Sequence, residues 1–268
     1  MSRTPARIAT VLLLSVLTAG PALAGDPTTP PPAAPAARLP ADAATRAAYD
    51  RADALSRSVF WTDQANLNPH DIEAGLKAAE ALRQMGRYPE AADAAGKVLM
   101  VQPGQYDALL EIGRDQIAAG QAFYGIAALE QARDARPDDW RPLSLLGTAY
   151  QQVRRPDDAR AAWTRALQLS PDNPDVLTNM AMAQMSGGDV AAAEPLLRRA
   201  AAQPGASLKV RLNLAMALGL GGKFAEAEQI LRRDLPPDQA DRNLAWLREH
   251  AEGPSADNAR TWNSLQGG

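Results

Sequence analysis

Apolar residues along most of this chain follow the spacing of helices that bury one face. Leu143, Leu146 and Tyr150 fall at intervals of three and four residues, as neighbours on one side of a helix do. A second helical stretch follows and ends at Pro171, because proline cannot donate to the helical hydrogen-bond ladder. The pattern predicts a hairpin of two antiparallel helices.

The hairpin pattern recurs with a constant period, which prolines mark at positions 69, 103, 137 and 171. A second series keeps the same spacing: Trp61, Ala95, Leu129, Trp163, Leu197 and Leu231. The turn between paired helices carries glycine in four repeats and Arg154 in the third, where a left-handed residue would end the first helix. One hairpin cannot bury both of its faces, so we expect neighbouring hairpins to stack into a continuous core.

The segment from position 140 to 173 resembles the tetratricopeptide repeat, a helix-turn-helix unit of about 34 residues. Its signature positions are occupied by Leu143, Leu146, Gly147, Tyr150, Ala159, Trp163, Ala166 and Pro171. Leu143 replaces the usual first tryptophan. The resemblance implies an all-α fold, a right-handed solenoid of antiparallel helix pairs. We expect Gly147 and Ala159 to let the two helices approach closely, with Trp163 filling the space between them.

Counting along the chain with this period divides it into repeats. We predict five of them, at residues 72–105, 106–139, 140–173, 174–207 and 208–237. Residues 43–71 are interpreted as a degenerate leading half-repeat. Residues 238–250 are predicted to form a capping helix with Asp238 as its N-cap and with Leu244 and Leu247 towards the array. Residues 251–268 are expected to be a flexible tail, on which Trp262 either packs back or serves as a docking peptide.

The segment that precedes Gly25 has the features of a secretory signal peptide. Arg3 and Arg7 precede a short apolar run, and Ala22-Leu23-Ala24 provides the small residues needed for cleavage. The run is about half the ~20 residues of a membrane span, so cleavage after Ala24 is favoured over an anchor. Residues 25–42 are rich in proline and alanine and predict an extended linker. We therefore expect a soluble periplasmic protein with no transmembrane span after signal cleavage.

Composition removes several classes of function. Among 268 residues there are no cysteines and two histidines, and the formal net charge is -3. Disulfides, thiolate metal sites, a cysteine nucleophile and a lipidated cysteine are therefore excluded, and no basic surface favours nucleic acid. Residues 219–223 resemble a phosphate-binding loop, but a predicted helix precedes them and Phe224 follows the lysine. We predict a non-catalytic protein without cofactor or metal.

A closer resemblance rests on the C-terminal third of the chain. Residues 214–228, the sequence R-D-L-P-P at 233–237 and the sequence N-L-A-W-L at 243–247 are similar to the last repeat of TadD-like proteins. The resemblance covers roughly residues 207–248 and implies a periplasmic scaffold that helps assemble a Tad (Flp) pilus, with pilus or secretin components as partners. Family members with a lipidated cysteine differ from this chain. A general envelope adaptor, serving cell-wall synthesis or outer-membrane assembly, is the alternative.

The working surface is predicted on the first helices of the repeats, which line the concave groove of tetratricopeptide proteins. Positions two, five, six, nine and twelve of each repeat commonly face that groove in the superfamily, where they would contact a protein or an extended peptide. Asparagine amides there both donate and accept hydrogen bonds, and methionines provide adaptable apolar contacts. The predicted partner-binding residues are Arg114, Thr148, Gln151, Thr178, Asn179, Met182, Asn213 and Met216.

Overall fold

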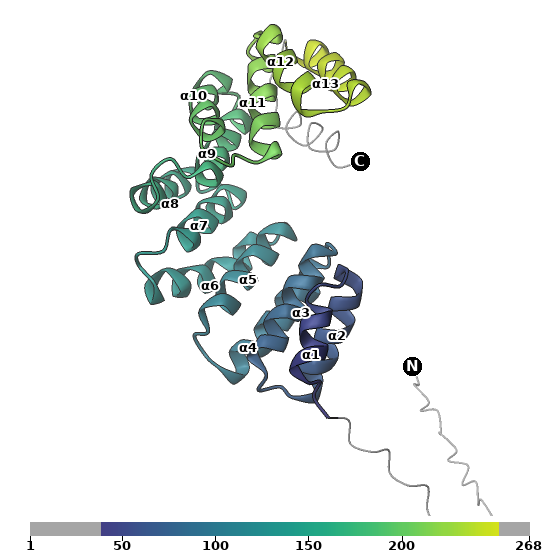
Figure 1. Ribbon diagram of the computed structural model, residues 1–268. Helices are drawn as coiled ribbons and strands as arrows, with labels where there is room; N and C mark the ends of the chain where they lie inside the picture. The colour runs from purple at the N-terminus through teal and green to yellow at the C-terminus, as the bar shows by residue number, and fades with distance from the viewer. Residues whose placement is uncertain (1–38, 252–268) are drawn as a thin grey trace, which may run out of the picture. The chain divides into compact units, whose positions relative to one another are not determined.

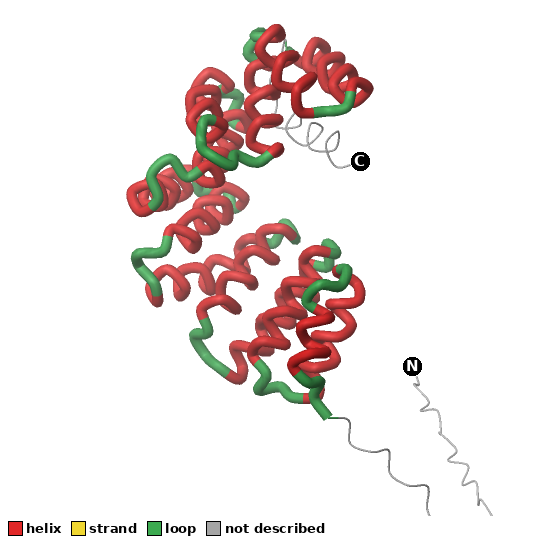
Figure 2. The backbone as a smooth tube through the Cα atoms, in the orientation of Figure 1, coloured by secondary structure: helices red, strands yellow, loops and turns green. Residues whose placement is uncertain are grey.

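The computed structural model describes residues 39–251, all of which belong to the unit Leu39–Gly268. The predicted signal peptide, the linker before residue 39 and the tail after residue 251 lie outside the described residues. The described part contains helices and no strand (Figure 2). The helices are α1 (Ala43–Tyr49), α2 (Ala54–Leu67), α3 (Ile72–Gln84), α4 (Tyr88–Val101), α5 (Tyr106–Ala118), α6 (Ala122–Ala135), α7 (Trp140–Gln152), α8 (Pro156–Leu169), α9 (Pro174–Ser186), α10 (Val190–Ala201), α11 (Leu208–Leu220), α12 (Phe224–Asp234) and α13 (Pro237–His250).

Helices adjacent in sequence are paired in space. Each of α3, α5, α7, α9 and α11 packs against the helix that follows it, and successive members of this set also contact one another. We call these the first helices, and α4, α6, α8, α10 and α12 the second helices (Figure 1). The first helices begin at one constant spacing, at Ile72, Tyr106, Trp140, Pro174 and Leu208. The predicted all-α stack of antiparallel helix pairs is therefore confirmed.

Turn residues and caps account for where the helices end. Gly86 follows the first helix of its pair with φ of 72°, and Arg154 takes the same place in the third pair with φ of 61°. This left-handed conformation costs an arginine more than a glycine, so the fold imposes it on Arg154. At the other end of the first helices, Asp71 accepts a hydrogen bond from the Ala74 amide at 3.0 Å, which satisfies an otherwise free donor.

The third pair shows how the two helices of a hairpin come together. Trp163 is buried between α7 and α8, and its indole Nε1 donates to the Ser144 carbonyl oxygen at 3.1 Å. A side chain at Gly147 would overlap the Trp163 ring, so the glycine is needed for this close approach. Both predictions for this hairpin are confirmed: Trp163 fills the space, and Gly147 makes room for it.

The two ends of the array differ from the inner pairs. At the N-terminal end, α2 packs against α3 and buries Trp61 to 1% exposure. At the C-terminal end, α13 packs against α11 and α12 and buries Leu244 and Leu247, as predicted. The prediction of Asp238 as the N-cap is wrong, because α13 begins at Pro237 and Asp238 lies in its first turn. No helix between residues 39 and 251 has the length and apolar character needed to cross a bilayer.

Candidate functional site

The predicted partner-binding residues all lie on first helices, but they differ in accessibility. Five are partly exposed: Arg114, Thr148, Gln151, Asn179 and Met182. Three are buried: Thr178, Asn213 and Met216. We use the name first-helix face for the surface formed by positions two, five, six, nine and twelve of the first helices. Its accessible part runs over α3, α5, α7 and α9.

The prediction that Asn213 and Met216 are available to a partner is wrong in this structure. They are 1% and 0% exposed, because α11 is surrounded by α9, α10, α12 and α13. Thr178 is also buried, and its hydroxyl donates to the Pro174 carbonyl oxygen at 2.6 Å. The sequence does contain a signal for the enclosure of α11. Residues 214–220 are apolar or glycine throughout, and a helix that is apolar on every side is a buried one.

Free amide groups remain on the accessible part of the face. The side chains of Gln151 and Asn179 make no hydrogen bond to other residues in the 39–251 region. Thr148, by contrast, donates to the Ser144 carbonyl oxygen at 3.3 Å within its own helix. Met182 is partly buried and packs against the apolar cluster that includes Leu197 and Leu214. The surface thus offers amide donors and acceptors beside a methionine, which suits contact with an extended peptide backbone.

A charged cluster lies where α3 meets α5, and sequence reasoning identified only Arg114 of it. Glu111 bridges two arginines: Arg83 Nε lies 3.0 Å from its Oε2, and Arg114 Nη1 lies 2.5 Å from its Oε1. The carboxylate of Asp115 is 0% exposed and lies 3.9 Å from Arg83 Nε. Burial, and then the charge of Glu111, raise the pKa of Asp115 to about 7.

A signal for this cluster was present in the repeat register. The tenth position of the first helix is alanine in four of the five repeats, at residues 81, 149, 183 and 217, and aspartate only at 115. The four cluster residues are near one another because one turn of α5 carries Glu111, Arg114 and Asp115, and α3 brings Arg83 beside them. Single-repeat comparison with a consensus does not reveal such a grouping, because it depends on which helices are neighbours.

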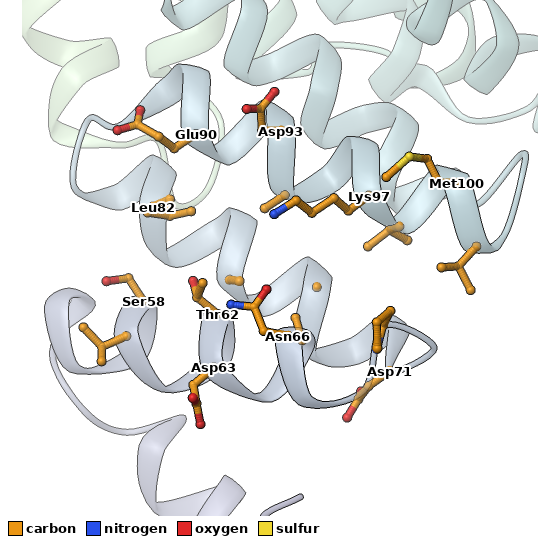
Figure 3. Close-up of a pocket in the computed structure, with 18 of the residues that line it drawn as sticks. Ser58, Thr62, Asp63, Asn66, Asp71, Leu82, Glu90, Asp93, Lys97 and Met100 are labelled. Atoms are coloured by element: carbon orange, nitrogen blue, oxygen red, sulfur yellow. The ribbon is translucent and has the colours of Figure 1, made fainter. Parts of the chain in front are cut away.

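A groove of about 820 Å³ lies on the other side of the first pair, between α2 and α4 (Figure 3). Its floor is formed by small residues of α3, including Gly75 and Ala78. Exposed apolar side chains stand on its walls, with Val59 at 64% and Met100 at 76% exposure. Its acidic rim is partly neutralised, since Asp71 pairs with Arg46, and Glu90 pairs with Arg87 at 3.1 Å. The groove is therefore an apolar cleft with a mixed polar rim.

Histidine, aspartate and glutamate are the side chains of this chain that could hold a metal ion. Within the part of the chain that the structure describes, no three histidine, aspartate or glutamate side chains are grouped as metal ligands. Asp115, a buried carboxyl group with a raised pKa, has two arginines and a glutamate beside it and does not line the groove between α2 and α4.

Comparison with known proteins defines the fold. A tetratricopeptide repeat family model matches residues 110–174, 144–207 and 178–240. The crystal structure of TTC0263, a tetratricopeptide protein of Thermus thermophilus, is similar with a TM-score of 0.58 and 19% identity, covering 66% of this chain and 98% of that one. MamA from Desulfovibrio magneticus RS-1, residue 41 to the end, gives a TM-score of 0.52 and 21% identity, covering 59% and 89%. No curated protein matches the chain in sequence.

The class of protein follows from these findings and from the packing described above. The fold is an all-α tetratricopeptide-repeat solenoid, as predicted, and residues 110–240 contain recognisable repeats of that family. Solenoids of this kind offer extended surfaces that bind proteins or peptides.

Proposed function

We propose that this chain is a periplasmic scaffold in the assembly of a Tad (Flp) pilus, and that it binds an extended segment of a pilus or secretin component along the first-helix face. The observation that carries the binding role is the pair of free amides, Gln151 and Asn179, on adjacent first helices. Successive first helices are in contact with one another. A peptide that crosses them would meet a donor and an acceptor on each helix.

The link to pilus assembly is supported by the C-terminal residues that resemble TadD-like proteins. The R-D-L-P-P segment ends α12 and begins α13. In that segment Asp234 Oδ2 accepts from Arg211 Nε at 2.7 Å, and Arg233 Nε donates to Asp234 Oδ1 at 2.9 Å. Leu244 and Leu247 of the following helix are buried. The similar residues therefore build the joint between the last repeat and its cap.

Export to the periplasm is proposed from the segment that precedes Gly25, which lies outside the described part. Fractionation of the producing cells, followed by N-terminal sequencing of the periplasmic form, tests it. The expected N-terminus is Gly25. A mature protein that retains the residues before Ile8 would contradict a cleaved signal.

Deletion of the gene in a piliated producing strain tests the pilus role. We expect loss of Flp fibres in electron micrographs and recovery on complementation with the wild-type chain. Complementation with a Gln151→Ala, Asn179→Ala double variant should fail, whereas Gln168→Ala on the exposed side of α8 serves as the matched control. Normal fibres after deletion would instead favour the general envelope adaptor. The residues similar to TadD-like proteins would then reflect only how the array ends.

A further inference from the structure

Asp115 has an environment that no other described carboxylate shares. It lies on α5 at the position where the other four repeats have alanine. It is 0% exposed, and neither of its carboxylate oxygens accepts a hydrogen bond. A buried carboxylate without a donor is costly when ionised. Its nearest cation is Arg83, whose Nε lies 3.9 Å from Oδ1, which is beyond hydrogen-bonding distance.

Arg83 is instead bonded to a competing acid. Its Nε lies 3.0 Å from Glu111 Oε2. Glu111 also binds Arg114, and the side chains of Arg83 and Arg114 remain 30% and 35% exposed on the first-helix face. One guanidinium thus lies between two carboxylates, bonded to one and too far from the other for a hydrogen bond.

The charged groups that act on Asp115 come from two helices only. Although α5 packs against α3, α4, α6 and α7, the interacting charges are Glu111 and Arg114 of α5 and Arg83 of α3. No described titratable side chain of α4, α6 or α7 contributes. Burial raises the pKa of Asp115 to about 7, so the neutral acid is the form that suits the contacts observed.

We propose that Asp115 is a pH-sensitive switch at the joint between the first two repeats, which exchanges Arg83 between Glu111 and Asp115. When Asp115 is protonated, Arg83 stays on Glu111, as in the structure. When Asp115 is ionised, it draws Arg83 inward and leaves Glu111 with Arg114 alone. The exchange changes the charges displayed at one end of the first-helix face, and it regulates the binding role proposed above.

Carboxyl ¹³C NMR of the isolated protein tests the exchange without any partner. The Asp115 carboxyl should titrate near pH 7, and the Glu111 carboxyl should show an inflection at the same pH as Arg83 leaves it. In an Asp115→Ala variant the Glu111 inflection should disappear. Asp115→Ala should fold, because alanine occupies this position in the other four repeats. Asp107→Asn, a change at an exposed acid on the same helix, should leave the Asp115 titration and the chemical-shift response of Glu111 unchanged.

Thermal unfolding gives an independent readout. The folded state holds the proton of Asp115 where the unfolded chain, with an ordinary pKa near 3.8, has released it. The stability due to this proton is therefore fully present below the unfolded value and is lost as pH rises through about 7. Between about pH 5 and pH 8, the Tm of the wild type should fall by about 5 °C more than the Tm of Asp115→Ala.

Two results would overturn the switch. One is an Asp115 titration near its ordinary value, with a wild-type Tm that follows that of Asp115→Ala at every pH. The other is a titration near neutrality with no response at Glu111, which would make Asp115 a buried acid that does not move Arg83. Because both measurements use the free protein, neither result bears on whether the chain serves a pilus. Loss of the pilus role would equally leave the switch standing.

Discussion

The first and last repeats differ in the residues that pack together at one equivalent pair of positions. The fourth residue of each first helix and the residue 23 positions later on the second helix form what we call the 4/27 pair. In the three inner repeats the pair is leucine with alanine: Leu109 with Ala132, Leu143 with Ala166 and Leu177 with Ala200. In the first repeat it is Gly75 with Val98, and in the last it is Arg211 with Asp234.

Each pair is complementary in its own way. In the first repeat the larger residue of the pair, Val98, is on the second helix and the smaller one, Gly75, is on the first. A Cβ at Gly75 would lie 2.5 Å from Val98 Cγ2. In the last repeat size matching is replaced by an ion pair, with Arg211 Nε 2.7 Å from Asp234 Oδ2. What the repeats share at this place is therefore the fit of two side chains, and the residue types are free to change if they change together.

The surroundings of the two terminal repeats also differ from those of the inner ones. Trp61 of α2 lies in one cluster with Ala74 and Ala78 of α3, so α3 has small residues where the tryptophan approaches. At the other end, Asp234 is the last residue of α12 and receives Arg233 as well as Arg211. The partly exposed arginine keeps its charge near water. Inner repeats pack between two other repeats, whereas the terminal ones have α2 or α13 on one side.

The largest effect is expected from putting the inner-repeat leucine into the first repeat alone. Gly75→Leu places a side chain where Val98 already lies, and overpacking should lower the free energy of unfolding by about 3 kcal/mol. Adding Val98→Ala recreates the leucine-alanine pair and should recover all but about 1 kcal/mol. Urea unfolding of the four chains of the cycle measures both. Additive losses would show that the two positions are not a pair.

The second effect concerns acid and belongs to the last repeat. The side-chain hydrogen bond from Arg233, with further help from Arg211, lowers the pKa of Asp234 from 3.8 to about 2. The ionised form is favoured by folding, so its contribution is present above the unfolded value and is lost as pH falls through about 2. The contribution is about 2 kcal/mol. Asp234→Asn should be less stable than wild type at neutral pH and should approach it in acid.

Asp234 and Asp115 should change the free energy of unfolding in opposite directions as pH rises, so the pH dependence of one checks that of the other. Asp234 stabilises the fold as pH rises from acid, whereas Asp115 destabilises it as pH approaches 7. Urea unfolding across the range from about pH 2 to pH 8 separates them. A wild-type and Asp234→Asn difference that stays constant down to pH 2 would exclude the assigned role of the arginines.

Features of the fold and of the candidate site that depend on one hairpin could be predicted from the sequence, whereas features that depend on contacts between repeats could not. Local features were predictable: the helix starts, the left-handed Arg154 and the Gly147–Trp163 fit all follow from one hairpin and its register. Burial of Asn213 was missed, because the groove positions were assigned one repeat at a time, whereas α11 is enclosed by four neighbouring helices, including the cap α13. The positions that commonly face the groove in the superfamily are accessible only where no other helix covers the first helix.

The same limit applies to residues that change together. The Arg211–Asp234 pair and the contact of Arg83 with Glu111 join residues that are 23 and 28 positions apart. Their partnership is visible only when equivalent positions of all five repeats are compared as pairs. A consensus comparison treats each position alone, so it registers Arg211 and Asp115 as departures and gives no reason for either.

A smaller effect should follow from giving the last repeat the inner pair. Asp234→Ala alone leaves Arg211, 30% exposed, without its main partner. Loss of the ionised carboxylate should cost about 2 kcal/mol, as in Asp234→Asn. Arg211→Leu with Asp234→Ala should return to within about 1 kcal/mol of wild type and should remove the acid dependence. If the double variant is no more stable to urea than Asp234→Ala, the ion pair has a role that leucine and alanine cannot replace.

The smallest effect separates the open inner repeats from the enclosed last one. Asn179 and Asn213 occupy the same position of their repeats, but Asn179 is partly exposed while Asn213 is 1% exposed. Asn179→Ala should weaken binding of a recovered partner about fivefold, or ~1 kcal/mol, with unchanged stability. Asn213→Ala should leave binding unchanged and alter only the unfolding curve, since its amide lies within the core around α11. Calorimetric titration and urea unfolding of both variants make the comparison. Equal losses of affinity would mean that α13 moves aside when the partner binds, and that the last repeat belongs to the first-helix face after all.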